Sequence, residues 1–424
     1  DNLKIRLSYG SLGNQQIGYY DFIQTITTKG SMSDYSFDGT VLGQHATVSD
    51  PVSGDQTWEK VVSKNLGLDL NMFNNRLSLT TDFYIRDTKG ILGKGKSLPS
   101  IYGASEPQMN ANNLRTKGYE LVLGWRDSFK LAGSTFSYGI TGTFSDYTAE
   151  YTKCDNPTGL IGDPYVGKKY GEIWGYKVDG LFRNDKDAAE YASRFDLSTV
   201  ASGYYTATGA YGKGVRGGDI KYLDLNGDNI VNGGKGTLDD PGDRRVIGNS
   251  SPRYQYGASL NFSWYGFDVS VFMQGIGRLD WYPGADNLRF WGPYCRPYAT
   301  FVPKNFMSQV WSEENPDAYF PRARAYTSLN SNSGTAYYTN DRYLQNLAYC
   351  RLKNLTIGYT IPRRLTSKVG IKECRIYFSG ENLATWSALK SDFLDPEQAA
   401  ADSDKKANVY PWCKTYSIGL NLTF

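Results

Sequence analysis

The side chains best suited to bind a ligand lie between positions 279 and 345, where aromatic and charged residues are interleaved. Flat aromatic rings stack on the apolar faces of sugars, while carboxylates and guanidinium groups bond sugar hydroxyls, so this composition indicates a glycan-binding loop. For any single residue, packing of the ring against the rest of the loop is the alternative. The candidates are Trp281, Asp286, Arg289, Trp291, Tyr294, Arg296 and Trp311.

A second candidate site is the segment 224–232, in which oxygen donors recur at alternate positions. Hard oxygen ligands at the first, third, fifth, seventh and ninth places of a short loop are typical of calcium binding. Asn229 stands where glycine normally makes the sharp turn, and Lys235 stands where a bidentate glutamate is expected, so a simple Asx-rich turn is the alternative. The donors are Asp224, Asn226, Asp228, the carbonyl of Ile230, and Asn232.

Catalysis is not expected from this sequence. His45 is the single histidine, and the chain has no G-x-S-x-G motif and no cysteine or histidine cluster, so a serine triad or a zinc hydrolase would lack parts. The five cysteines include no C-x-x-C pair. A net charge of +3 over 424 residues gives no indication of a nucleic-acid partner.

The element that closes the chain has the clearest pattern. In residues 415–424, Tyr416, Ile418, Leu420 and Phe424 alternate with polar residues such as Asn421. Strict alternation predicts a strand with one apolar and one polar face. An edge strand of a soluble β-sandwich is the alternative, but the terminal aromatic residue favours the closing strand of an outer-membrane β-barrel.

The same alternation recurs along the chain and predicts an all-β antiparallel fold of about ten strands. The abundance of Tyr (34), Phe (19) and Trp (9) agrees with a membrane barrel rich in interfacial aromatic residues. Short turns alternate with long connections at about 11–59, 151–252, 279–345 and 387–410. The expected strands lie at about 3–10, 60–73, 76–90, 111–126, 134–150, 253–264, 266–278, 346–361, 371–386 and 411–424.

Several segments, in this order, resemble the C-terminal half of the barrel of a SusC/RagA-type TonB-dependent transporter. The resemblance implies a barrel of about 22 strands in the outer membrane, with its long loops at the cell surface. It also implies an N-terminal plug and a TonB box that are absent from these 424 residues, so the chain is expected to be a fragment or one piece of a split transporter. The segments are LKIRLSYGSLGN, NNRLSLTTDFYIRDTKGIL, GDIKYLDLNGDNIV, DRRVIGNSSPRYQYGASLNFSWYGFDVSVFMQGIG, RLKNLTIGYTIP, IYFSGENLATWS and TYSIGLNLTF.

The resemblance implies a function as well. It predicts TonB-dependent uptake of oligosaccharides together with a SusD-like surface lipoprotein, with peptides or other large nutrients as alternative cargo. A passive pore or a surface adhesin is the alternative that lacks the plug. Within the segment 171–182, which resembles a recurrent family element, Trp174 and Tyr176 are candidate contacts to the lipoprotein. Tyr416 and Phe424 resemble the signal for membrane insertion.

Overall fold

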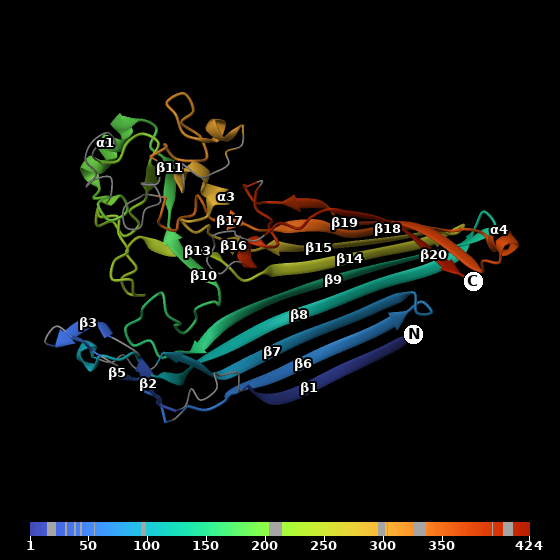
Figure 1. Cartoon of the computed structure of the whole chain (residues 1–424), viewed down its shortest axis with the longest axis horizontal. Coiled ribbons are helices and arrows are strands. Elements are labelled where there is room, and N and C mark those ends of the chain that lie inside the picture. The colour runs from blue at the N-terminus through green and yellow to red at the C-terminus, as the bar shows by residue number, and fades with distance from the viewer. Residues whose placement is uncertain are drawn as a thin grey trace.

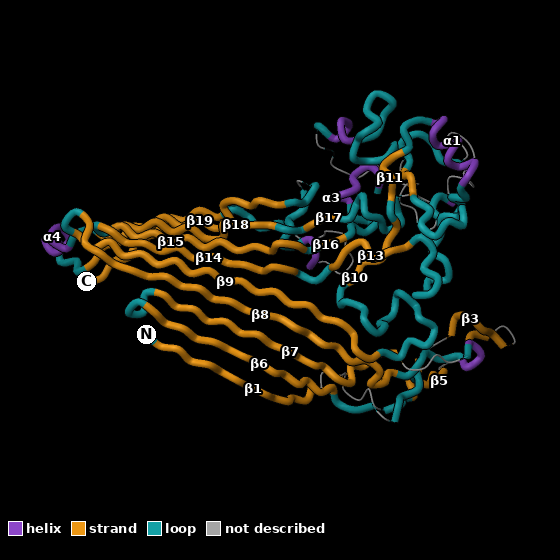
Figure 2. Tube along the Cα trace, turned by 180° about the vertical axis from the view of Figure 1, so that it is seen from behind, coloured by secondary structure: helices purple, strands orange, loops and turns teal. Residues whose placement is uncertain are grey.

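The structure is a computed structural model, and its main feature is one long, curved antiparallel sheet with a body of loops at one end (Figures 1 and 2). The residues it describes are 1–14, 23–29, 32–37, 40–42, 45–54, 56–94, 99–202, 214–295, 302, 304–324, 336–391, 393–401 and 410–424.

Ten strands form the sheet, and each is antiparallel to the next one along it, in chain order. This confirms the ten predicted strands, although several run further than expected. The strand predicted at 111–126, for example, covers Gln108–Leu131. The strands are β1 (Asn2–Asn14), β6 (Glu59–Met72), β7 (Leu77–Lys94), β8 (Gln108–Leu131), β9 (Ser134–Lys153), β14 (Arg253–Trp264), β15 (Phe267–Arg278), β18 (Tyr349–Thr360), β19 (Glu373–Ser387) and β20 (Thr415–Thr423).

The sheet has one apolar and one polar face. Directly paired residues share a face, and the register aligns Leu7 with Leu66, Leu66 with Phe83, and Phe83 with Tyr119. Leu7 is 79% exposed and Leu420 is 57% exposed, although both are large apolar side chains. A whole face of exposed apolar residues is what a strand surface facing lipid presents.

The polar face carries ion pairs between strands. Arg6 of β1 donates to Asp69 of β6 and to Asp82 of β7, each at 2.9 Å. Arg375 of β19 donates to Asp268 of β15 at 2.9 Å. These pairs cross-link strands of the sheet, two of them across an intervening strand, on the side opposite the apolar rows. The alternation predicted from the sequence is therefore confirmed on both faces.

Two rows of aromatic rings bound the apolar face. Near the loop end of the sheet, Tyr119 lies 6.4 Å from Phe83 and 5.9 Å from Phe144, measured between ring centroids. Near the other end, Phe136 lies 5.4 Å from Phe129 and 6.3 Å from Phe262. Phe136 and Phe144 are eight residues apart on β9, about 26 Å along the strand or about 20 Å after the usual tilt. That height approaches the apolar band of about 25 Å expected for an outer-membrane strand.

Tight turns join the strands at the end of the sheet where both chain termini lie (Figure 1). Ala132 and Gly133 have φ of 47° and 85°, and Tyr265 and Gly266 have φ of 49° and 83°. Two successive residues at positive φ make the turn type that matches the twist of a hairpin. The helical turns α4 (Arg363–Thr366) and η4 (Ser367–Val369) join β18 to β19 at the same end.

The described parts of the long connections lie at the opposite end of the sheet (Figure 1). Small elements lie beside the first strands: β2 (Ile26–Lys29), β3 (Met32–Phe37), β4 (Thr40–Leu42), β5 (His45–Val48) and η1 (Ser100–Tyr102). Across the described residues, no helix is long and apolar enough to cross a membrane.

Candidate functional site: the loop body

The candidate site lies in the loop body, which we define as the described residues of 154–252, 279–348 and 388–401. Three short antiparallel strand pairs organise it: β10 (Glu172–Tyr176) with β13 (Arg244–Asn249), β11 (Val178–Leu181) with β12 (Ile220–Tyr222), and β16 (Asp280–Trp281) with β17 (Gln345–Asn346). Helix α1 (Asp185–Arg194) lies farthest from the sheet in Figure 1. The shorter helical segments are α3 (Leu288–Trp291), η2 (Gly292–Tyr294), η3 (Phe306–Gln309) and η5 (Ala399–Ala401).

Four of the predicted sugar-stacking rings are buried in the core of the loop body. Trp281, Trp291, Tyr294 and Trp311 are between 0% and 6% exposed. The indole N–H of Trp291 donates to the carbonyl of Gly284 at 3.1 Å, so this ring is held from its polar edge as well. The structure therefore leaves these rings no free face for a sugar. For these four residues it favours the packing alternative that the sequence left open.

The charged candidates of the same loop lie differently. Asp286 and Arg289 are exposed. The Arg289 guanidinium donates to the carbonyl of Phe393 at 3.4 Å, and the Ser391 hydroxyl donates to the carbonyl of Arg289 at 3.2 Å. Arg289 thus joins the 279–345 loop to the connection between β19 and β20. Arg296 lies outside the described residues.

A buried group of polar side chains fixes the centre of the loop body. The Asn340 amide donates to the Tyr282 hydroxyl at 3.0 Å and to the carbonyl of Tyr338 at 2.8 Å. Burial raises the pKa of both Tyr222 and Tyr282 well above the ordinary value. These phenols therefore stay neutral, and the Tyr282 hydroxyl donates in turn to the carbonyl of Tyr338 at 3.1 Å.

Nearby, Arg324 and Asp219 form an ion pair in the same core. The guanidinium donates to the two carboxylate oxygens at 2.9 and 2.6 Å, and the side chains are 4% and 1% exposed. Burial raises the pKa of Asp219 to about 6, even though the guanidinium opposes the change. The carboxylate also accepts the backbone N–H of Arg216 at 2.7 Å, which anchors the start of this segment.

The two predicted lipoprotein contacts differ in exposure. Tyr176 is 5% exposed and meets Tyr222 edge to face, with ring centroids 5.4 Å apart. Its backbone N–H donates to the carbonyl of Thr339 at 2.9 Å, which ties β10 to the later loop. Tyr176 is therefore a core residue in this structure, whereas Trp174 is half-buried.

The predicted calcium loop is closed by its own backbone. Asp224 accepts the N–H of Gly227 at 2.7 Å and of Asn229 at 2.9 Å, and Asp228 accepts the N–H of Ile230 at 2.8 Å. Asn226 and Asn232 accept backbone N–H groups in the same way. Asn229 has φ of 64°, the left-handed conformation expected of the glycine it replaces. Within the described residues, no three His, Cys, Asp or Glu side chains are grouped to hold a metal ion, and the calcium site stays a prediction.

Sequence reasoning missed a charged cluster where β18 meets the loop body. Arg351, 2% exposed, donates to Asp395 at 2.7 and 2.8 Å and to Glu397 at 2.7 Å. Lys353 donates to Glu397 at 2.8 Å, and its ammonium lies 4.9 Å from the centre of the Trp412 ring, which is 49% exposed. The charges of 387–410 were visible in the sequence, but no local periodicity links them to residues more than forty positions earlier.

The two residues of the predicted insertion signal lie at the end of the chain. Tyr416 is 63% exposed and Phe424 is 73% exposed. Tyr416 stacks beside Phe378 of the neighbouring strand, with ring centroids 6.3 Å apart. Their role in insertion stays a prediction.

Comparison with known proteins agrees with this architecture. No protein-family profile matches the chain. TonB-dependent receptor P3 of Formosa agariphila is 26% identical over 99% of this chain and 39% of its own length, and TonB-dependent receptor SusC of Bacteroides thetaiotaomicron is 22% identical over 100% of this chain and 38% of its own length. The solved RagAB peptide transporter shares the fold with a TM-score of 0.68 and 21% identity, over 100% of this chain and 41% of that one.

The chain therefore spans about two fifths of the length of the curated relatives it matches. The sequence match and the fold match each run along almost the whole chain. The chain is therefore similar to SusC-type TonB-dependent receptors in sequence and to the RagAB transporter in fold.

Proposed function

We propose that this chain forms part of the wall and the surface loops of an outer-membrane importer for large nutrients. In this proposal, cargo is held between the loops and a SusD-like lipoprotein, and TonB drives release through a plug region. The observation that carries the proposal is the two-faced sheet with all long connections at one end, combined with relatives that are TonB-dependent receptors. An apolar face bounded by aromatic rows supports contact with outer-membrane lipid.

Oligosaccharide is the first candidate cargo. Because the four buried rings are committed to packing, the exposed ring of Trp412 becomes the better stacking surface. Lys353 and Glu397 lie beside it and supply the donor and the acceptor that sugar hydroxyls require. Tyr410, 87% exposed, extends the aromatic surface two residues earlier.

Peptide is the second candidate cargo, and the same cluster supports it. A cation and a carboxylate next to an aromatic ring also suit a peptide chain, whose ends and side chains carry both charges. The loss of four stacking rings to the core weakens the sugar assignment more than the peptide assignment. Trp174 stays a candidate contact to the lipoprotein, and calcium binding at the 224–232 loop is proposed as an accessory to loop structure.

The test uses the complete transporter in its native membrane. Mild solubilisation and affinity capture should recover a surface lipoprotein, and cells should accumulate labelled oligosaccharide only while TonB is energised. Trp412→Ala should reduce that uptake, with Trp386→Ala, an exposed tryptophan on the neighbouring strand, as the matched control. Uptake that continues after TonB is removed would make the chain a passive pore, and binding without any uptake would make it an adhesin.

A further inference from the structure

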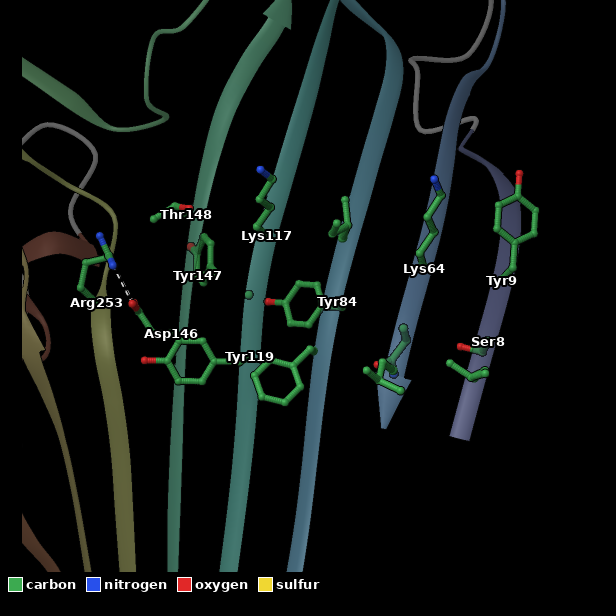
Figure 3. Close-up of a pocket in the computed structure, with 16 residues that line it drawn as sticks. Ser8, Tyr9, Lys64, Tyr84, Lys117, Tyr119, Asp146, Tyr147, Thr148 and Arg253 are labelled. Carbon is green, nitrogen blue, oxygen red and sulfur yellow. Dashed lines mark hydrogen bonds and ion pairs between the residues drawn. The ribbon is translucent and has the colours of Figure 1, made fainter. Parts of the chain in front are cut away.

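A pocket of about 920 Å³ crosses the first strands of the sheet near its loop end (Figure 3). Its position in the register is informative. Lys64 of β6 pairs with Ile85 of β7, and Ile85 pairs with Lys117 of β8, so both lysines belong to one row across the sheet. Leu66 and Phe83 pair with each other two residues farther from the loops, and they belong to the apolar face. The lysines therefore sit on the apolar face, directly above its last apolar row.

Both lysines are exposed, and neither forms an ion pair with any residue that the structure describes. The neighbouring cations of the same region are neutralised. Arg253 donates to Asp146 at 2.6 Å, and Arg115 donates to Asp87 at 2.6 Å. Figure 3 shows the ammonium groups of Lys64 and Lys117 pointing toward the loop end of the sheet. The row thus carries two lysines that have no ion-pair partner among the described residues, while Asp87 and Glu150, one same-face row nearer the loops, pair with Arg115 and Lys169.

We propose that this pocket binds an outer-membrane lipid through a phosphate-bearing headgroup. The lipid phosphate lies between Lys64 and Lys117, and its acyl chains run along Leu66 and Phe83 toward the other end of the sheet. The two lysines are separated by two strand spacings, about 10 Å between backbones, which their flexible side chains can close around one phosphate. The inference rests on the proposed function, because it requires the apolar face to meet lipid.

The apolar row beneath the lysines selects a lipid over a free anion. Leu66 is 47% exposed and Phe83 is 54% exposed, so both offer open hydrocarbon surface to an acyl chain. A lysine near a membrane surface contributes about a fivefold gain in affinity for an anionic lipid, and the two together about 30-fold. A soluble phosphate would meet the same two lysines but would lack acyl chains. The contribution of acyl chains to affinity grows with every buried methylene.

The experiment places the complete transporter in phosphatidylcholine nanodiscs that contain a titrated fraction of dioleoyl phosphatidic acid. Native mass spectrometry then counts the phosphatidic acid molecules retained per protein. We expect Lys64→Gln combined with Lys117→Gln to weaken retention about 30-fold. Lys4→Gln with Lys130→Gln removes the same charge from exposed positions on the polar face and should retain phosphatidic acid like the wild type.

Two results would overturn the proposal. One is equal retention by the wild type and the Lys64/Lys117 variant, once both have the same thermal unfolding midpoint in the nanodisc. The other is displacement of phosphatidic acid by inorganic phosphate or glycerol 3-phosphate at matched concentration, which would mean that the headgroup binds without the chains. Cargo uptake is measured separately in cells, so an importer that works without this lipid site is distinguished from a chain that is no importer.

Discussion

Replacing Arg351 by methionine should release the segment 388–401 from the sheet. Arg351 is almost fully buried and forms charge-assisted hydrogen bonds with Asp395 and Glu397. In the variant, Lys353 still pairs with Glu397, so Asp395 is the carboxylate left without a cation. Removing one member of a buried ion pair destabilises the structure by about 3–5 kcal/mol. The lower end of this range applies here, because Glu397 keeps its ion pair with Lys353. A cost of about 3 kcal/mol raises the opening equilibrium of the segment about a hundredfold.

Hydrogen exchange read by mass spectrometry measures this opening directly. The amides of Gln398 and Ala399 donate to the carbonyl of Asp395, in the turn that Arg351 anchors through the Asp395 carboxylate. They therefore exchange when loss of this anchor lets the turn open. We expect their exchange to rise about a hundredfold in Arg351→Met, while the amides of β19 stay protected. Lys353→Met is the control, and it should change exchange less than about fivefold because that pair is less buried. Unchanged exchange at Gln398 and Ala399 in Arg351→Met would refute the view that this cluster holds the segment.

Three further predictions concern the sheet and the loop core. Leu420→Arg should destabilise the protein by roughly 2–4 kcal/mol if the residue lies at mid-membrane, whereas Asn421→Arg should have a mild effect, and equal unfolding midpoints in urea would contradict the assigned faces. Gly118→Ala should lower the free energy of unfolding by about 1–3 kcal/mol, because the added Cβ would lie 2.5 Å from the Tyr84 ring. Gly142→Ala, whose Cβ would meet no atom within 4 Å, serves as the control in the same unfolding assay. Burial raises the pKa of Asp219 to about 6 in the folded chain, so the protonated carboxyl favours folding. It contributes about 3 kcal/mol to the free energy of unfolding below about pH 4, and this contribution is lost as the pH rises to about 6. Asp219→Asn should remove this pH dependence from thermal melts taken across that range, and a dependence that persists would contradict the assignment.

The strands were predictable because their signal is local. Alternation places Leu420 and Asn421 on opposite faces whatever the rest of the chain does, and the structure confirms that pattern. Strand ends were less certain. The β8 strand continues to Leu131 although its alternation weakens after Trp125, because pairing with β9 extends to the tight turn at Ala132.

The loop body was not predictable in the same way. An aromatic residue in an irregular segment looks the same in sequence whether it stacks on a ligand or packs in a core, and Trp291 is fully buried while Trp412 is half-exposed. The cluster around Arg351 depends on contacts between residues more than forty positions apart, which no periodicity encodes. Composition therefore could not indicate which side chains of the loop remain available to a ligand.

The apolar residues of this chain need two different solvents in order to fold. In the loop body, rings such as Trp291, Phe290 and Tyr343 cover one another, so water alone can drive their collapse. The apolar face of the sheet has no such partner within the described chain, and residues such as Leu7 and Ile418 stay exposed until lipid covers them. The loop body can thus condense in an aqueous compartment while the strands still await the bilayer. An assembly machinery that receives this chain would handle a segment already folded at one end and unfinished at the other.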